Sequence, residues 1–239
     1  MTVTDDSLAL ALSSSTGVMS AAVGRPGAPD PLAATTLATD RRHAEEISPL
    51  IQKLLADSGI TLGDLQLLVV DRGPGRFTGL RVGLATITTL AFALGIPVVG
   101  LTSLEVLAAV ARSRSAGEAA GSGPALTAIT AVIDARRNEV FQQRFGIDLE
   151  PAVAPAVGPA AELAVEARGI VVGDGLDRYR DDYEAAAVAD VRLVAGVEVD
   201  AAVMLAMAVD REAVAGSAIE PLYLRDPDVN PNVKTRPRL

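Results

Sequence analysis

The sequence predicts an α/β protein that is built from two similar halves. Short apolar runs typical of buried strands alternate with longer segments in which apolar residues recur at helical spacing. The first half opens with a strand, a polar turn and a second strand, and a similar but degraded order restarts after a linker rich in Ser, Gly and Ala. Together these patterns indicate a duplicated α/β fold.

The first half is predicted to be a β-hairpin followed by alternating helices and strands. Gly59 and Gly95 are expected to end helices, and Pro97 prevents the second helix from continuing. In chain order, the expected elements are strands at 8–12, 18–23 and 32–37, a helix from Asp40 to Gly59, a strand at 65–70, a helix to about Leu94, a strand at 98–101 and a helix from Ser103 to about Arg112.

The second half begins after the clearest linker, 113–124, which has no periodicity. A segment at 151–159 is rich in Ala and Pro and is expected to be irregular, and the stretch from Pro221 onward is expected to be extended. The expected regular elements are strands at 126–134 and 139–145 around a turn, a strand at 170–172 and a helix at 201–215.

Composition excludes several classes of function. The chain of 239 residues contains no cysteine, which rules out disulfides, thiolate zinc sites and cysteine nucleophiles and suits a reducing cytosol. Residues 1–7 are acidic and lack the basic start of a signal peptide. The formal charge of −9 argues against binding a nucleic-acid backbone alone, because that requires Lys and Arg to neutralise phosphates.

One stretch is apolar enough to raise the question of a membrane span. Residues 82–104 contain no charge, but Gly95-Ile96-Pro97 interrupts them and three threonines dilute them. We therefore expect a buried helix, a stop and a buried strand rather than a membrane span.

A glycine-rich loop precedes the second predicted helix. Such a turn between a buried strand and a helix can bind an anion with backbone N–H groups, or can simply allow tight packing. Local chemistry leaves both alternatives open, and the spacing matches neither the Walker nor the dinucleotide pattern. Gly79 and Gly83 share one face of the helix and indicate close approach of another helix. The candidate loop residues are Gly73, Gly75, Arg76, Thr78 and Gly79.

Several motifs along the chain resemble those of one protein family. The run from Arg72-Gly73-Pro74-Gly75 through Phe77-Thr78-Gly79 to Gly83 closely resembles the signature of the TsaB family, also called YeaZ. The resemblance extends to five further motifs in the same order, namely His43-Ala44-Glu45-Glu46, Gly95-Ile96-Pro97, Ile133-Asp134-Ala135-Arg136, Val172-Gly173-Asp174-Gly175 and Glu220-Pro221-Leu222-Tyr223.

The resemblance implies a fold and a role. The fold would be the two-lobed actin-like fold of sugar kinases, heat-shock proteins and actin, with mixed sheets flanked by helices. Residues 1–112 would form the lobe with the partner-binding helices, and 125–239 the second lobe, whose C-terminal helix could pack back on the first. The protein would be a cytoplasmic, non-catalytic scaffold for threonylcarbamoylation of tRNA adenosine.

The resemblance also implies partners. The catalytic paralogue TsaD and the small ATPase TsaE would carry the metal and the ATP, and this subunit would bind nucleotide weakly or not at all. It would form a homodimer when alone, contact tRNA only through the complex, and have no membrane association.

The residues agree with a helper rather than an enzyme. Where active members of the actin-like class place an acid at the end of the first strand, this chain has Ser13, and a hydroxyl cannot neutralise a divalent metal. The single histidine, His43, lacks the co-ligands of a metal site and is expected at an exposed helix start. We therefore expect neither catalytic nor metal-binding residues.

The functional surface is expected to be a contact between two helices of each subunit. The alternative is that both apolar stripes face the protein's own sheet, as one face of each helix must. Asp134, Arg136 and Arg137 are expected to shape a hairpin turn, and Arg76 and Thr78 to touch a nucleotide or the ATPase. The candidate interface residues are Ile47, Leu50, Ile51, Leu54, Leu80, Gly83, Leu84 and Ile87.

Two other functions remain open at the level of sequence. One is an ATP-dependent small-molecule kinase of the actin-like class, for which Gly173-Asp174-Gly175 is the candidate second phosphate loop. The other is an independent homodimeric regulator. The sequence leaves the role of the basic tail open, where Lys234, Arg236 and Arg238 could touch tRNA or balance local acids.

Overall fold

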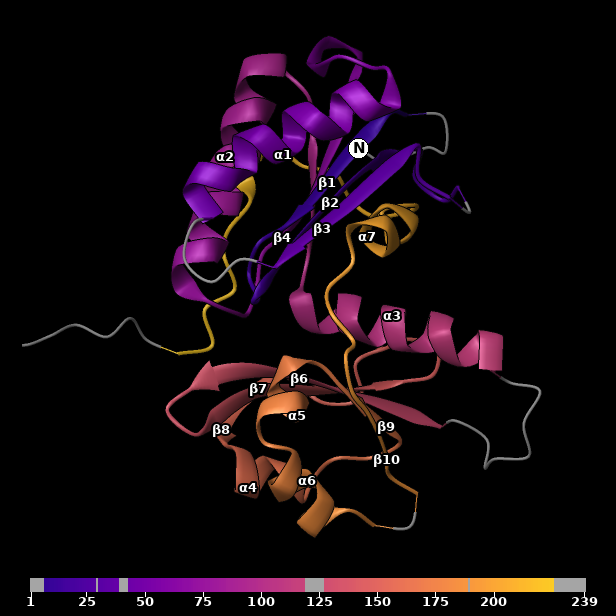
Figure 1. Cartoon of the computed structure of the whole chain (residues 1–239), viewed down its shortest axis with the longest axis vertical. Helices are drawn as coiled ribbons and strands as arrows, with labels where there is room; N and C mark the ends of the chain where they lie inside the picture. Colours follow the sequence, from indigo (N-terminus) through magenta and orange to yellow (C-terminus); the bar gives the residue numbers. More distant parts are fainter. Residues whose placement is uncertain (1–6, 29, 39–42, 119–126, 189, 226–239) are drawn as a thin grey trace, which may run out of the picture.

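Two five-stranded mixed sheets, one in each lobe, form the framework of the protein. The computed structural model describes residues 7–28, 30–38, 43–118, 127–188 and 190–225. Helices cover the outer faces of both sheets, and further helices lie between them (Figure 1). The result is the predicted actin-like α/β arrangement of mixed sheets flanked by helices.

The N-terminal sheet has the strand order β3-β2-β1-β4-β5. β1 pairs antiparallel with β2 and parallel with β4, so Ala9 lies between Gly24 and Leu67. The five strands are β1 (Ala9–Ser13), β2 (Val18–Gly24), β3 (Ala33–Ala38), β4 (Leu67–Asp71) and β5 (Val98–Leu101).

The C-terminal sheet repeats this topology, with the order β10-β9-β6-β7-β8. β6 pairs antiparallel with β7 and parallel with β9, as β1 does with β2 and β4. The predicted duplication is thus confirmed. The strands are β6 (Ala128–Arg136), β7 (Glu139–Gly146), β8 (Ala156–Pro159), β9 (Ile170–Val172) and β10 (Arg192–Val194).

The helices form three layers around the two sheets. α1 (His43–Ser58) and α2 (Phe77–Leu94) cover the outer face of the first sheet. α3 (Ser103–Glu118) and α7 (Ala201–Met207) pack between the sheets, and Figure 1 shows α7 returning to the first lobe. The outer face of the second sheet carries α4 (Ala160–Ala164), α5 (Asp174–Arg178) and α6 (Arg180–Ala186), and two short 3-10 turns are η1 (Leu62–Asp64) and η2 (Gly216–Ala218).

The two lobes share one central core. Inner-face residues of both sheets, including Ala11, Val99 and Ile133, belong to the same buried cluster as residues of α3 and α7. Two further clusters fill the outer layers on either side. Because burial of apolar surface is the main favourable term in folding, the lobes stabilise one another through this shared layer.

The apolar helix α2 is confirmed as a helix that stops before a strand. Gly95 adopts the left-handed conformation with φ of 67° and its N–H bonds to the Ala91 carbonyl, which ends the helix as predicted. α2 is also the one described helix long and apolar enough to span a membrane, by length and composition only. Its inner face packs on the sheet through Leu80 and Ile87, as a core helix does.

Some predicted boundaries were wrong. α3 continues to Glu118, so 113–118 is helix rather than linker, and the rest of the predicted linker, 119–124, lies outside the described residues. The segment predicted as irregular contains β8, which forms because β7 offers it an edge. α7 ends at Met207 rather than Ala215, because the following chain turns to bridge Val98 with Val214.

Candidate functional site at the lobe junction and the outer helix pair

In the loop between β4 and α2, backbone N–H groups form hydrogen bonds with acceptors of the protein itself. The Gly73 N–H donates to the Asp71 carboxylate (2.8 Å), and the Arg76 N–H donates to the Ser15 carbonyl (2.5 Å). A side chain at Gly75 would overlap the Ser15 carbonyl group. These contacts favour the structural turn over a phosphate cradle, because two of the loop N–H groups already have acceptors.

Gly79 and Gly83 were expected to allow close approach of another helix, but the segment that approaches them is the turn between β1 and β2. The Ser14 hydroxyl donates to the Gly79 carbonyl (2.9 Å), and a Cβ at Gly83 would collide with the same hydroxyl. The turn between β1 and β2 therefore docks on α2. Both glycines are buried, whereas Thr78 is exposed at the start of the helix.

A buried carboxylate, Asp71, lies at the end of β4. It accepts hydrogen bonds from the hydroxyls of Ser13 (2.8 Å), Ser103 (2.6 Å) and Ser15, besides the Gly73 N–H. Burial raises the pKa of Asp71, and these hydrogen bonds oppose the rise. Ser13 thus serves as a hydrogen-bond donor that helps to satisfy Asp71.

Asp71 was not among the functional residues predicted from the sequence. The available signal was an acid at the carboxyl end of an apolar run, next to a glycine-rich loop. The duplication gives it a counterpart, because Asp174 follows β9 as Asp71 ends β4. Asp174 accepts a hydrogen bond from the Asp134 N–H (2.9 Å), so each lobe places a carboxylate at the same position in its sheet, buried in the first lobe and partly buried in the second.

Two acids at the lobe junction, Asp174 and Glu198, have pKa values above their ordinary range. Burial, with the nearby charge of Asp134, raises the pKa of Asp174 to about 6. Burial, with the charges of Asp174 and Asp177, raises the pKa of Glu198 to about 7. The charge of Arg76 in the first lobe lowers both values, so this cluster couples the two lobes electrostatically.

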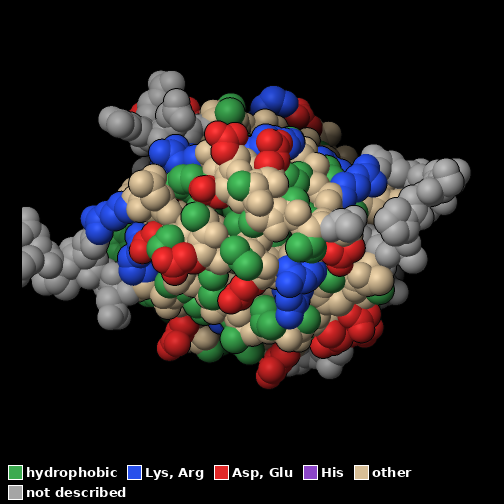
Figure 2. All heavy atoms as spheres, turned by 90° about the horizontal axis from the view of Figure 1, so that it is seen from below, with side chains coloured by type: hydrophobic (Ala, Val, Ile, Leu, Met, Phe, Trp, Pro, Cys, Tyr) green, Lys and Arg blue, Asp and Glu red, His purple; other side chains and the backbone are tan. Residues whose placement is uncertain are grey.

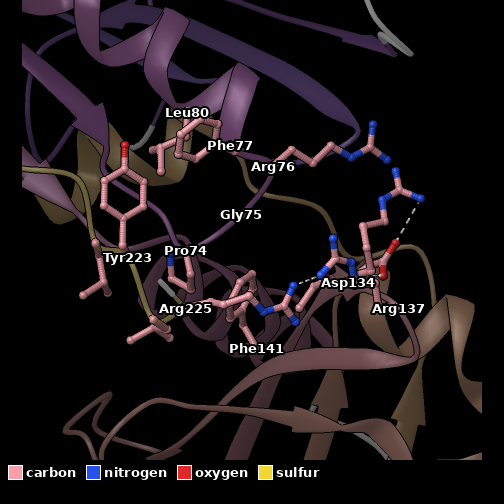
Figure 3. Close-up of a pocket in the computed structure, with 14 residues that line it drawn as sticks. Pro74, Gly75, Arg76, Phe77, Leu80, Asp134, Arg137, Phe141, Tyr223 and Arg225 are labelled. Atoms are coloured by element: carbon pink, nitrogen blue, oxygen red, sulfur yellow. Dashed lines mark hydrogen bonds and ion pairs between the residues drawn. The ribbon is translucent and has the colours of Figure 1, made fainter. Parts of the chain in front are cut away.

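A cleft of about 500 Å³ lies between the lobes, beside the start of α2. Figure 3 shows Arg76 and Arg137 at one end of it and Tyr223 at the other. The lining residues come from the loop before α2, the β6–β7 turn and the C-terminal segment, and are Pro74, Gly75, Arg76, Phe77, Leu80, Asp134, Ala135, Arg136, Arg137, Phe141, Leu222, Tyr223, Leu224 and Arg225.

The C-terminal segment attaches to both sides of this cleft. On the first lobe, Arg81 Nε donates to the Tyr223 hydroxyl (2.9 Å), and the Arg81 guanidinium lies 3.9 Å from the centre of the Phe77 ring. On the second lobe, Arg225 donates to the Ala135 carbonyl (3.1 Å) and pairs with Glu139. The segment therefore connects the lobes along one edge of the cleft.

The eight predicted interface residues do not form a free surface. All of them are buried, and the seven that carry an apolar side chain pack in the core beneath α1 and α2. The prediction that these residues form a partner interface is therefore wrong, and the alternative, that both apolar stripes face the protein's own sheet, is correct. One face of each helix must cover this sheet.

The opposite face of α2 is exposed and almost uncharged. From Val82 to Leu94 it contains no charged residue, and Ala85, Thr89 and Phe92 lie on the solvent side. The Phe92 side chain is 90% exposed, the largest value among the described large apolar residues. A shallow hollow beside it is lined by Thr88, Ile96, Pro97 and residues 215–217. The predicted interface residues did not include this face, because α2 is apolar on nearly every side and its pattern does not show which side is exposed.

Metal-binding and catalytic groups were not expected. Within the described part of the chain, no cluster of three or more His, Cys, Asp or Glu side chains could hold a metal ion. His43 begins α1, but its side chain is outside the described set. Lys234, Arg236 and Arg238 of the basic tail also lie outside it.

The far end of the second lobe offers no continuous basic surface among the described residues. Figure 2 shows acidic and basic side chains scattered between apolar ones over this end of the molecule. A nucleic-acid backbone would meet both signs of charge here, which agrees with the overall charge of −9.

Comparisons with known proteins agree on one relationship. Residues 36–171, more than half of the chain, match the family model described as TsaD: tRNA N6-adenosine threonylcarbamoyltransferase. A protein of Mycobacterium tuberculosis named as uncharacterized is 39% identical over 52% of this chain and 51% of its own. The Escherichia coli tRNA threonylcarbamoyladenosine biosynthesis protein TsaB is 28% identical over 59% of this chain and 61% of its own.

A solved structure extends the match to nearly the whole fold. A Pseudomonas aeruginosa protein described as similar to peptidase YEAZ superposes with a TM-score of 0.76 and 28% identity, covering 92% of this chain and 100% of the other. In sequence, the chain spans about half the length of the curated relatives that it matches first.

Proposed function

Because the chain belongs to the TsaB family, also called YeaZ, we propose that it is a non-catalytic scaffolding subunit for threonylcarbamoylation of tRNA adenosine next to the anticodon. The names of its relatives support a role in the biosynthesis of tRNA threonylcarbamoyladenosine. In this proposal the chain pairs with the catalytic paralogue TsaD, is joined by the ATPase TsaE, and forms a homodimer when alone. It works in the cytoplasm and leaves ATP and metal to its partners.

The observation that carries the scaffold role is the uncharged exposed face of α2. The apolar ring of Phe92 is exposed to water and would be removed from it only if a partner covered it. Small residues such as Ala85 beside it allow another helix to approach closely. We infer that this face, and not the buried stripes of α1 and α2, contacts the paralogue.

Lipid is a poorer candidate than protein for this face. The inner side of α2 packs against the first sheet through Leu80, Leu84 and Ile87, so the helix cannot enter a bilayer without dismantling its lobe. A protein partner needs only the exposed side.

The kinase alternative is disfavoured by the chemistry at the strand ends. The Asp71 carboxylate is buried and occupied by four donors, including Ser13, so it does not project toward a ligand. Gly173 and Gly175 lie where side chains would meet Val132 and Ile133, so tight packing accounts for them. Steady ATP turnover by the pure protein would revive this alternative.

Co-purification with the paralogue tests the scaffold proposal. We would compare the wild type with Phe92→Glu and Ala85→Glu, and use Val165→Glu as the matched control, because Val165 is a 60% exposed apolar residue on the other lobe. Circular dichroism would verify that each variant is folded. We expect a stoichiometric complex with wild type and control, and loss of the complex with both α2 variants.

The opposite pattern would refute the proposal. If the wild type does not pair at micromolar concentration, the scaffold role fails. If it pairs and the folded α2 variants pair equally well, the role stands and the assignment of the face fails.

A further inference from the structure

Basic residues outnumber acidic ones among the residues that line the cleft between the lobes. Four of the residues that line it are arginines, Arg76, Arg136, Arg137 and Arg225, and Asp134 is the one acid among them. The chain as a whole carries −9. A local excess of guanidinium groups in an otherwise acidic protein favours an anionic ligand.

The backbone holds two of these arginines in an unfavourable conformation. Arg136, Arg137 and Asn138 all have positive φ, at 65°, 58° and 61°. Residues with a Cβ adopt this region at a cost of about 1 kcal/mol or more each, and glycine would adopt it freely. Positive φ at both central residues is what a two-residue hairpin turn favours, and here this turn presents cationic side chains to the cleft.

The acid in the cleft is already engaged. Asp134 Oδ1 accepts hydrogen bonds from the Arg136 N–H (2.8 Å) and the Tyr179 hydroxyl (3.2 Å), and Oδ2 pairs with the guanidinium groups of Arg136 (3.3 Å) and Arg178 (3.6 Å). These contacts leave it poorly placed to bind the magnesium ion that accompanies a triphosphate. The chemistry therefore suits the single phosphates of a nucleic-acid backbone better.

Aromatic rings form the opposite end of the cleft. Phe77 and Tyr223 are 45% and 39% exposed, and their ring centres are 5.7 Å apart. Arg81 fixes both, through its contact with the Phe77 ring and its bond to the Tyr223 hydroxyl. Partly exposed rings near arginines are the combination that binds unstacked bases of single-stranded RNA.

We propose that this cleft binds one unstacked nucleotide of a single-stranded RNA segment. Arg136 and Arg137, with Arg76, receive the phosphate, and the base lies against Tyr223 and Phe77. The cleft volume of about 500 Å³ suits a ligand of this size. The chain's own C-terminal tail is a poor occupant, because its residues Lys234, Arg236 and Arg238 would repel the arginines.

The inference rests on the proposed function in one respect, since it names a contact that this chain would make with the RNA substrate. It adds a local site to a protein whose overall charge is unsuited to RNA. The α2 face and the cleft use different residues, so each can fail without the other.

Fluorescence anisotropy with a labelled single-stranded oligouridine at low salt tests the proposal on the full chain. Tyr223→Leu removes the ring and should weaken binding about five- to 150-fold, whereas Tyr223→Phe keeps it and should bind within about twofold of wild type. Arg137→Asn removes one cation and still tolerates positive φ, and should weaken binding about five- to tenfold and reduce the salt dependence. Arg211→Asn, at an exposed arginine outside the cleft, is the control and should change nothing.

Competition identifies the ligand. Unlabelled RNA should displace the probe at far lower concentration than AMP, magnesium ATP or oligoglutamate. No RNA binding by the wild type, or equal losses in the cleft and control variants, overturns the proposal. If AMP or ATP displaces the probe as effectively as RNA does, the cleft binds a free nucleotide. If oligoglutamate does so, the cleft binds an acidic protein segment. Each of these results also overturns the proposal. Pairing with the paralogue would be measured on the same variants, so a loss of RNA binding is not mistaken for a loss of assembly.

Discussion

Replacing Asp174 by asparagine should stabilise the protein at about pH 8 and change its stability little at about pH 4. Asp174 is partly buried at the lobe junction and accepts a hydrogen bond from the Asp134 N–H (2.9 Å). An asparagine Oδ1 can accept the same bond without carrying a charge. The substitution therefore removes the cost of holding a charged carboxylate beside Asp134 and Glu198.

The sign follows from the folded pKa. Burial raises the pKa of Asp174 from 3.8 to about 6, so between these values the folded protein holds a proton that the unfolded chain has lost. The stability that this group contributes is complete below the unfolded pKa and is lost as the pH rises through about 6. The difference between the two pKa values corresponds to about 3 kcal/mol, which is the upper limit of the expected gain at about pH 8.

Urea unfolding followed by circular dichroism would measure this gain at both pH values. Asp190→Asn, at an exposed acid, is the matched control and should gain nothing at either pH. The charge of Asp174 is one of the causes that raise the pKa of Glu198 to about 7, so the gain at about pH 8 also includes the relief of Glu198, and wild type and variant are compared at one pH at a time. A variant that loses stability at about pH 8 would show that the Asp174 charge is stabilised in the folded protein. Equal gains at both pH values would show that the gain does not come from the charge, and either result would refute the reasoning.

Three further substitutions test the packing around the site, each by urea unfolding against wild type. Asp71→Ala should cost about 2–4 kcal/mol, because the serine hydroxyls and the Gly73 N–H lose a common acceptor, and an unchanged midpoint would contradict the role of the carboxylate. Gly75→Ala should cost about 1–3 kcal/mol, since its Cβ would lie 2.9 Å from the Ser15 carbonyl carbon, and a neutral result would mean that the turn moves aside freely. Leu84→Glu should prevent folding at neutral pH because it places a charge in the core, and a stable, folded variant would show that Leu84 lies on a free surface after all.

Much of the fold was predictable from local patterns. The strands 98–101 and 170–172 were predicted with the observed bounds, because short apolar runs between glycine or proline signals leave little choice. The end of α2 was predictable from Gly95, which adopts the left-handed conformation that a helix terminus requires. The linker was misplaced because Ser113 and its neighbours tolerate a helix, and packing of α3 between the lobes decided the matter.

The candidate site was less predictable than the fold. The cleft brings Arg76, Arg137 and Tyr223 together from three separate parts of the sequence. The glycine-rich loop was recognised, but the partner of Gly75 is Ser15, and no local pattern indicates such a contact. The face of α2 that is exposed to solvent could not be predicted either, because α2 is apolar on nearly every side.

The sequence by itself determined the duplicated α/β order, the places where helices stop and the family to which the chain belongs. These depend on periodicity, on glycine and proline, and on motifs read along the chain. Only the tertiary structure decided that both lobes share a core, that Ser13 satisfies Asp71, and that Phe92 rather than Leu84 faces solvent. The reason is that burial and hydrogen-bond partnership depend on residues far apart in sequence, and an apolar helix gives no internal sign of which face the sheet will cover.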